Sequence, residues 1–185
     1  RTFNPRLGIV GGISILGTSG IVEPMSEKAL IDTIEVEMNV KKAENPNILI
    51  MTPGNYGADF LSRYYGIDID RAVKCSNFIG ASVDMSVKAG FKKILFIGHI
   101  GKLVKVAGGI MDTHSKNADC RMEIMITAAL KFTEDIKLLR TVAECSTTDA
   151  AIELLKSNGL LEPVMSEITK KIVFYLNKRA DNKTE

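Results

Sequence analysis

Three short apolar runs, each followed by a turn, constrain the fold of this chain more than any other feature of its sequence. They cover residues 7–10, 48–51 and 94–97, and a glycine follows each of them within three positions. Continuously apolar runs, as opposed to alternating ones, are typical of strands that are covered on both faces. Helical patterns over residues 26–44 and 79–89 separate the runs. This alternation predicts a Rossmann-like, mostly parallel α/β sheet flanked by helices, with right-handed crossovers.

The second half of the chain has a different secondary-structure pattern. From about residue 117 onward the pattern is mostly helical, which predicts a helical C-terminal portion. A weaker strand candidate lies at residues 72–75, and residues 178–185 are polar enough that we expect a flexible tail. A length of 185 residues fits a single α/β domain over the whole chain. The predicted C-terminal helices cover residues 118–132, 137–144, 149–156 and 163–177, and a capping pattern at residues 146–148 predicts the start of the third.

Composition narrows the classes of partner. The chain has 24 Lys and Arg against 22 Asp and Glu, a formal net charge of +2, so electrostatics give no case for a nucleic-acid partner. No apolar run approaches the roughly 20 residues that a membrane helix needs, so no membrane attachment is expected. Because the chain opens on Arg1 instead of Met, we expect it to be part of a longer protein, and we see no signal peptide.

The cysteines indicate the compartment. Cys75, Cys120 and Cys145 are odd in number and widely spaced, which is typical of free thiols in a reducing cytoplasm. Cys75 could be a reactive thiol, but a small buried hydrophobic residue at a strand end is the favoured interpretation.

Glycine-rich segments follow the apolar runs, at the strand ends where open parallel sheets bind their ligands. In the first segment, residues 11–20, Thr18 stands where a phosphate-binding P-loop needs its lysine, and the dinucleotide pattern G-x-G-x-x-G is absent. A nucleoside-like ligand without a polyphosphate fits better, although a tight turn without a ligand would explain the same glycines. The cofactor-binding candidates here are Gly11, Gly12, Gly17, Thr18, Ser19 and Gly20.

The second segment, residues 52–60, reads as a loop with polar and aromatic side chains. Nucleoside-binding α/β domains often place an acid after the second strand to bind ribose, and the nearest acid here is Asp59. Asn55 could make such a hydrogen bond and Tyr56 could stack on a ring, whereas an ordinary Pro-Gly-Asn turn is the alternative. The cofactor-binding candidates are Gly54, Asn55, Tyr56 and Gly57.

The third segment, residues 98–115, also reads as a loop, and it contains both histidines of the chain, His99 and His114. Histidine is the side chain most readily used for acid–base chemistry near neutral pH, which makes both residues candidates for catalysis. They lie fifteen positions apart and no cysteine pair completes a ligand set, so no metal site is expected.

Basic residues lie in and just after the same segment. Lys102 and Lys105 are three positions apart, so a helix would bring them to one face, where they could receive carboxylates together with Lys116 and Arg121. The substrate-binding candidates are Lys102, Lys105, Ser115 and Arg121.

Together these motifs resemble one family, the cobalt-precorrin-5B C1-methyltransferases, which are the D-type methyltransferases of anaerobic cobalamin biosynthesis. Family members are much longer, and their N-terminal half is missing from this chain. Ser19 stands where a second threonine is expected, which keeps a hydroxyl. The similarity covers residues 4 to about 160, in the motifs GGISILGTSGIVEPMS (11–26), GNYG (54–57), KCSNFIG (74–80), GHIGKLVK (98–105) and AGGIMDTHS (107–115).

The resemblance implies transfer of a methyl group from S-adenosylmethionine to C1 of cobalt-precorrin-5B, giving cobalt-precorrin-6A. It implies no separate protein-bound metal, because the cobalt arrives inside the tetrapyrrole. S-adenosylmethionine has a nucleoside and no phosphate, which suits a glycine loop without a P-loop lysine. The acetate and propionate groups of the substrate suit Lys102, Lys105 and Arg121. The alternatives are a dinucleotide-dependent oxidoreductase, which the missing G-x-G-x-x-G disfavours, and a non-catalytic tetrapyrrole-binding module.

Overall fold

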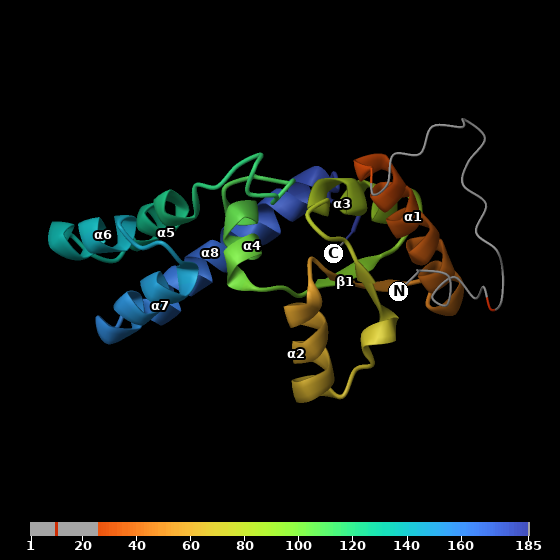
Figure 1. The fold of residues 1–185 in the computed structure, drawn as a ribbon, viewed down its shortest axis with the longest axis horizontal. Coiled ribbons are helices and arrows are strands. Elements are labelled where there is room, and N and C mark those ends of the chain that lie inside the picture. The colour runs from red at the N-terminus through yellow and green to blue at the C-terminus, as the bar shows by residue number, and fades with distance from the viewer. Residues whose placement is uncertain (1–9, 11–25, 185) are drawn as a thin grey trace.

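The computed structural model describes Val10 and residues 26–184, which form a mixed α/β fold (Figure 1). The predicted strand at residues 7–10, apart from Val10, and the glycine-rich segment 11–20 lie outside the described residues. The elements in chain order are α1 (Glu27–Glu44), β1 (Ile48–Thr52), α2 (Asn55–Tyr65), the 3₁₀ turn η2 (Ile69–Arg71), β2 (Ala72–Lys74), α3 (Ile79–Lys88), β3 (Lys93–Phe96), α4 (Ile100–Ala107), α5 (Arg121–Ala129), α6 (Ile136–Ala143), α7 (Thr148–Ser157) and α8 (Leu161–Arg179).

The described strands form one parallel sheet in the order β2–β1–β3. Ile50 in the central strand lies opposite Ala72 of β2 on one side and Leu95 of β3 on the other. The chain therefore passes from β2 to β3 across β1, and α3 makes that crossover. The predicted parallel sheet is confirmed, including its weaker strand candidate at residues 72–75.

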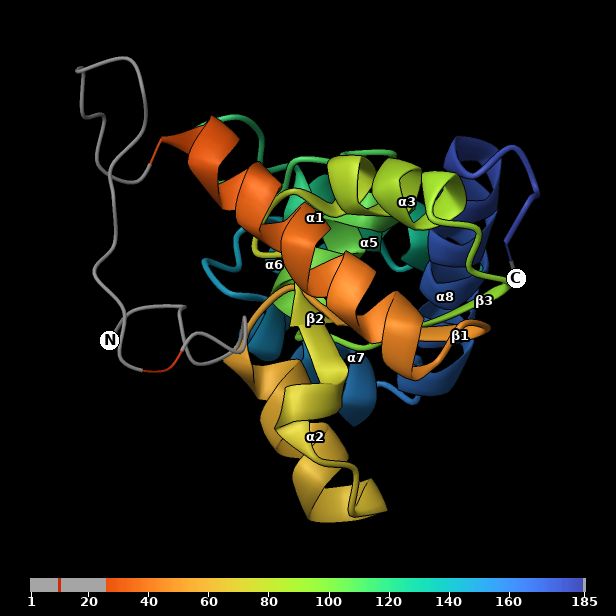
Figure 2. The same ribbon diagram turned by 90° about the vertical axis from the view of Figure 1, so that its right-hand side faces the viewer.

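One face of the sheet holds the first apolar core. Side chains alternate between the two faces of a strand, and Leu49 and Met51 of β1 are fully buried against α1 and α3. Figure 2 shows α1 and α3 lying side by side over the sheet. Ser26 begins α1 as its N-cap, because its hydroxyl accepts a hydrogen bond from the N–H of Ala29.

The helix α8 connects this core to a second one. Its 19 residues span about 28 Å, since each helical residue rises 1.5 Å. Val164 and Ile168 pack in a cluster with α4, α5, α6 and α7, whereas Ile172 and Leu176 reach the sheet core. The α5–α7 end therefore lies far from α1 (Figure 1), and the predicted helical C-terminal portion is confirmed.

Two segments predicted as loops contain helices, so those predictions were wrong. α2 begins at Asn55 inside the segment 52–60, and α4 occupies residues 100–107 of the segment 98–115. Glycines at the start of each helix indicated turns, but Gly57 and Gly98 are instead sites of close packing. A Cβ at Gly98 would lie 2.5 Å from Cγ of Pro53.

The helix predicted over residues 118–132 begins later than expected. Cys120, directly before α5, has a left-handed backbone with φ +62°, which a right-handed helix cannot contain. Asp119 accepts two hydrogen bonds from the guanidinium of Arg121 and so shapes this entry to the helix.

The C-terminal residues make specific contacts. α8 continues to Arg179, Ala180 is buried, and the hydroxyl of Thr184 donates a hydrogen bond to the carbonyl of Phe91. Flexibility of residues 178–185 stays a prediction.

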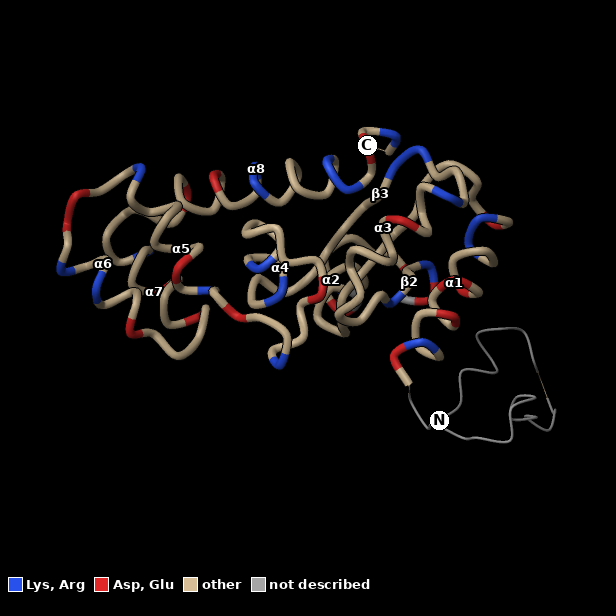
Figure 3. Tube along the Cα trace, turned by 90° about the horizontal axis from the view of Figure 1, so that it is seen from above, with Lys and Arg blue, Asp and Glu red and all other residues tan. Residues whose placement is uncertain are grey.

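Charges are mixed over the surface. Figure 3 shows Lys and Arg interspersed with Asp and Glu along the length of the molecule. Among the described helices, none combines the length and the apolar character that a bilayer crossing requires.

Candidate functional site

Two neighbouring hollows open at the carboxyl ends of the strands. We call the one between the ends of β1 and β3 the histidine hollow; its volume is about 310 Å³, and its polar lining includes Tyr56, His99, Arg121, Thr148 and Asp149. We call the one between the ends of β1 and β2 the lysine hollow; its volume is about 330 Å³, and its polar lining includes Thr33, Glu37, Asn55, Lys74 and Ser76. Pro53, Gly54 and Lys102 line both hollows.

The strand order explains why hollows form here. The chain leaves β1 toward β2 on one side, whereas β3 lies on the other side of β1. In open α/β sheets such a change of direction leaves a crevice at the carboxyl ends of the strands, and ligands bind there. The loops after all three described strands therefore lie at the same end of the sheet. The sequence predicted this for the loops after residues 48–51 and 94–97, whereas the other predicted loop, residues 11–20, lies outside the described residues.

Gly54 and Gly57, two cofactor-binding candidates, occupy different surroundings. A Cβ at Gly54 would meet no atom within 4 Å, because this residue faces the open space of both hollows. A Cβ at Gly57 would overlap the carbonyl oxygen of Ile97 and lie 3.2 Å from Cβ of Thr52. Gly57 is therefore explained by the close approach of α2 to the end of β3.

The N-terminus of α2 points its free N–H groups into this region. No side chain caps the helix, and Gly54 occupies its N-cap position. The first N–H groups of a helix have no intrahelical acceptor and carry partial positive charge, so they favour carboxylates and other acceptors.

Asn55 and Lys74 form a polar contact inside the lysine hollow. The ammonium of Lys74 donates a hydrogen bond to Oδ1 of Asn55 over 3.0 Å. Glu37 of α1 lines the same hollow and is 8% exposed. No local pattern marked Lys74 or Glu37, because the pairing of β2 with β1 brings Lys74 to Asn55, and the packing of α1 brings Glu37 to the hollow.

Lys102 stands between the hollows. Its ammonium donates to the carbonyls of Pro53, over 2.7 Å, and of Ser76, over 3.4 Å. Ser76 has a left-handed backbone with φ +52°, an uncommon conformation for a serine. Partial burial lowers the pKa of the Lys102 ammonium; the Cys75 thiol opposes this, and Lys105 adds to it.

Cys75 lies near Lys102 and is fully buried. Burial raises the pKa of its thiol to about 12, more than the nearby Lys102 lowers it. A thiol with this pKa stays neutral near pH 7 and is a poor nucleophile. These surroundings agree with the interpretation of Cys75 as a small buried residue.

His99 is held by contacts to both ring nitrogens. It is the N-cap of α4, and its Nδ1 accepts a hydrogen bond from the N–H of Gly101 over 3.1 Å. Its Nε2 lies 3.8 Å from Oδ1 of Asp149, and its ring centroid is 5.0 Å from that of Tyr56. Because Nδ1 accepts this hydrogen bond, the hydrogen of a neutral ring lies on Nε2, so His99 can donate a hydrogen bond from Nε2 but has no free ring nitrogen to accept a proton.

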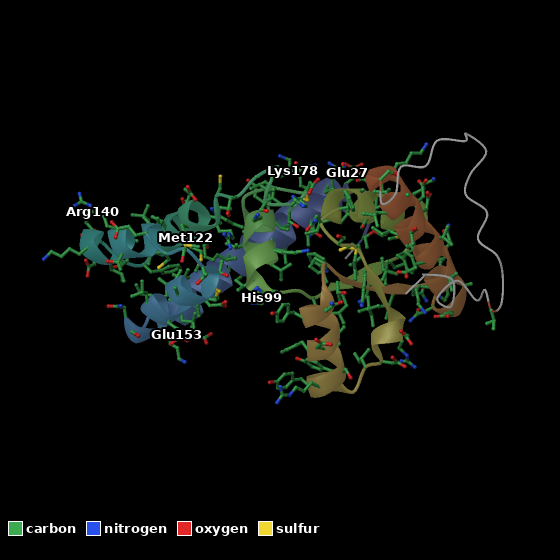
Figure 4. All side chains as sticks on the ribbon, viewed as in Figure 1. Glu27, His99, Met122, Arg140, Glu153 and Lys178 are labelled. Carbon is green, nitrogen blue, oxygen red and sulfur yellow. The ribbon has the colours of Figure 1, made fainter. Side chains whose placement is uncertain are left out.

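The helix α7 supplies the far wall of the histidine hollow. Thr147 caps α7 by accepting a hydrogen bond from the N–H of Ala150, and Thr148 and Asp149 follow it at the helix start. Figure 4 shows His99 at the end of α4 that faces α7 and α2. The capping pattern at residues 146–148 predicted a helix start, but no sequence signal linked it to His99.

Arg121 lines the histidine hollow but is already paired. Its Nε and Nη2 donate to the two carboxylate oxygens of Asp119 over 2.6 and 2.9 Å. These hydrogen bonds hold the pKa of Asp119 below its usual range and raise that of Arg121. A substrate carboxylate would have to share or displace Asp119.

Lys105 lies in a different position from its neighbour Lys102. It is 4% exposed, and its ammonium donates to the carbonyls of Thr113 and Ala118. Its contacts therefore hold the segment between α4 and α5, and it lines neither hollow.

His114 and Ser115 lie in the same connecting segment and are exposed. The Nδ1 of His114 accepts a hydrogen bond from the N–H of Lys116, and the His114 N–H donates to Asp112. Lys116 in turn forms an ion pair with Glu27 at the start of α1. The two histidines are thus separated, with His99 before α4 and His114 after it, and His114 lines neither hollow.

No cluster of three or more His, Cys, Asp or Glu side chains among residues 26–184 is arranged to hold a metal ion.

Comparison with known proteins gives the family. Residues 112–185 match the model of the CbiD C-terminal domain, and residues 1–24 match the CbiD model. A relative from Ruminiclostridium cellulolyticum, named cobalt-precorrin-5B C(1)-methyltransferase, is 52% identical over 183 residues, which are 99% of this chain and 48% of the relative. Proteins of the same name from Alkaliphilus metalliredigens and Methanococcus aeolicus are 48% and 42% identical, over 94% and 97% of this chain and 47% of each relative.

The chain spans about half the length of the curated relatives it matches. No solved structure matches it. Matches at both ends of the chain, and relatives aligned across nearly all of it, confirm the resemblance of its motifs: the chain belongs to the CbiD family.

Proposed function

We propose that this chain carries the site at which S-adenosylmethionine methylates C1 of cobalt-precorrin-5B to give cobalt-precorrin-6A. The observation that carries the proposal is the pair of hollows that share Pro53, Gly54 and Lys102. Two ligands bound in them would meet at the end of β1, which is what direct transfer of a group between them requires. The names of the relatives support this reaction, and the residues shared by the two hollows support this position for it.

The lysine hollow suits the methyl donor. Its volume of about 330 Å³ lies within the usual range for small-molecule sites. Lys74 and the uncapped start of α2 would bind the carboxylate of S-adenosylmethionine, and Asn55 would bind its ribose hydroxyls. The glycine-rich segment 11–20 precedes α1, which lines this hollow, and we propose that it completes the cofactor site.

The histidine hollow suits one edge of the tetrapyrrole. Tyr56 offers an aromatic surface, and Arg121 would exchange its pairing with Asp119 for a substrate carboxylate. His114 and Ser115 would contact the substrate from the exposed connecting segment. We assign Lys105 to holding that segment, because its ammonium is already satisfied by carbonyls.

Alignment is the main contribution expected from the protein. S-adenosylmethionine supplies an electrophilic methyl group on a sulfonium, and displacement by carbon needs the reacting atoms in line. Orientation of this kind can be worth about 7–11 kcal/mol of the barrier. His99, fixed by Gly101 and Asp149, would donate a hydrogen bond from Nε2 to an acceptor on the tetrapyrrole, so it positions the substrate without removing a proton.

Calorimetric titration tests the donor site. S-adenosylhomocysteine should bind the 185-residue chain in the micromolar range, and Lys74→Met should weaken binding at least tenfold. Lys137→Met, which changes an exposed lysine of α6, is the matched control and should leave binding unchanged. Failure of the folded chain to bind, or equal effects of the two variants, would refute a donor site in the lysine hollow.

Parallel titrations with NAD and with a cobalt-corrinoid separate the alternative functions. Binding of NAD in place of S-adenosylhomocysteine would support an oxidoreductase. Binding of the corrinoid alone would support a non-catalytic tetrapyrrole-binding module.

A further inference from the structure

One face of the parallel sheet is only partly covered by the described residues: Thr52 and Ala72 are buried on it, whereas positions in β1 and β3 are exposed. α1 and α3 cover the face that carries Leu49 and Met51, but on the opposite face Ile48 is 45% exposed and Leu95 is 42% exposed. The strand register places Ile50 directly beside Leu95, so these apolar side chains form one continuous strip. Parallel sheets occur almost only with both faces covered, because their strands carry apolar side chains on both sides.

The helix α2 extends the exposed apolar surface on this side. It projects away from the body of the fold, on the side of the sheet opposite α1 and α3 (Figures 1 and 2). Leu61 is buried, but Phe60 is 44%, Tyr64 65% and Tyr65 66% exposed. The three rings cluster, with the Phe60 centroid 4.9 Å from that of Tyr64 and 5.8 Å from that of Tyr65. Clustered exposed aromatic residues are typical of protein interfaces.

The length of the relatives indicates what covers this surface. The match to the Ruminiclostridium cellulolyticum relative accounts for 48% of that protein, so slightly more than half of it, about 200 residues, lies outside the match. A segment of that size is a typical domain, and a standard interface needs only about 800 Å² from each partner. Because the relatives carry both parts in one chain, a contact between the parts is available in every molecule.

We infer that the open sheet face of Ile48, Ile50 and Leu95, together with the α2 ring cluster, is the docking surface for a polypeptide equivalent to the unmatched part of these relatives. Docking would cover the apolar strip and hold α2 in place. α2 supplies Asn55 to the lysine hollow and Tyr56 to the histidine hollow, so docking would also fix one wall of both hollows. This inference does not depend on which reaction the hollows perform.

Sedimentation velocity and calorimetry test the surface. The 185-residue chain is titrated with the unmatched part of the Ruminiclostridium cellulolyticum relative, expressed as a separate polypeptide. We expect a complex of one copy of each, and we expect Leu95→Glu or Tyr64→Glu to weaken it at least tenfold. Leu130→Glu is the matched control, because Leu130 is also exposed, at 54%, but lies at the end of α5. Circular dichroism confirms that each variant is folded.

Three results would overturn the inference. One is the absence of any complex between the two folded polypeptides. Another is equal affinity of the Leu95→Glu and Leu130→Glu variants, which would place the contact elsewhere. The third is a dimer of the chain by itself that Leu95→Glu dissociates while the added polypeptide stays unbound, which would assign the surface to a second copy.

Discussion

Two glycines three positions apart allow close packing to be separated from ligand contact. In Gly57→Ala the new Cβ would overlap the carbonyl oxygen of Ile97 and lie 3.0 Å from the carbonyl carbon. Both neighbours are backbone atoms, so either α2 or the end of β3 must move. Forcing a methyl group into a packed site costs typically about 1–3 kcal/mol, and a clash with backbone atoms belongs to the upper part of that range, about 2–3 kcal/mol. Replacing glycine by alanine inside a helix returns up to about 1 kcal/mol, which leaves a net loss of about 1–2 kcal/mol.

Gly54→Ala is the matched comparison. Its Cβ would meet nothing within 4 Å, and Gly54 has an extended backbone at φ 176°, which any residue adopts. We expect its stability to stay within about 0.5 kcal/mol of the parent. Because Gly54 lines both hollows, its added methyl group should instead weaken binding of S-adenosylhomocysteine.

Thermal unfolding followed by circular dichroism measures the difference. For a chain of this size 1 kcal/mol corresponds to about 2–4 °C in Tm, so Gly57→Ala should unfold about 2–8 °C below the parent. Gly54→Ala should unfold with the parent and differ from it in calorimetric titration. Equal Tm values for the two variants would refute the packing explanation for Gly57. Unchanged ligand affinity of Gly54→Ala would remove Gly54 from the binding site.

Three further predictions concern single residues. Burial raises the pKa of the Cys75 thiol from its ordinary value of 9.0 to about 12, so above pH 9 the thiol ionises in the unfolded chain while the folded chain keeps the proton. Its contribution to stability is therefore complete below pH 9 and is lost as the pH rises toward 12. Between pH 8 and pH 10, denaturant titrations should show the parent losing about 1.4 kcal/mol more than Cys75→Ala, and equal losses would contradict burial as the cause. His114→Ala should lower turnover with the tetrapyrrole, measured by kinetics, more than it lowers affinity for the donor, measured by calorimetry. Equal losses would mean that His114 acts in the donor site or has a structural role. Thr184→Val should cost about 1 kcal/mol in denaturant unfolding, because the carbonyl of Phe91 loses its buried hydrogen bond. An unchanged midpoint would show that the C-terminal residues do not hold this contact in solution.

Local pattern predicted most of the architecture. The apolar runs at residues 48–51 and 94–97 became β1 and β3, because a buried parallel strand needs apolar side chains on both faces. The capping pattern at residues 146–148 marked the start of α7, because capping is a contact between neighbours in sequence. The loop predictions for residues 52–60 and 98–115 were wrong because they relied on glycine as a local signal. Glycine usually indicates a local turn. At Gly57 and Gly98, however, atoms of Ile97 and Pro53, which are distant in sequence, leave no room for a Cβ.

In the candidate site, too, some features follow from local sequence and others only from tertiary packing. Sequence pattern by itself determined the family, the parallel strands and the placing of Gly54, Asn55, Tyr56 and His99 at strand ends, because strand ends and motifs are local properties of the chain. Only the tertiary structure decided which of the basic residues face the hollows and which partners they meet. Lys102 and Lys105 share one short helix, yet one stands between the hollows and the other is buried against carbonyls. Asp149 reaches His99 and Lys74 reaches Asn55 because packing joins segments 50 and 19 positions apart, and no local pattern encodes such a contact.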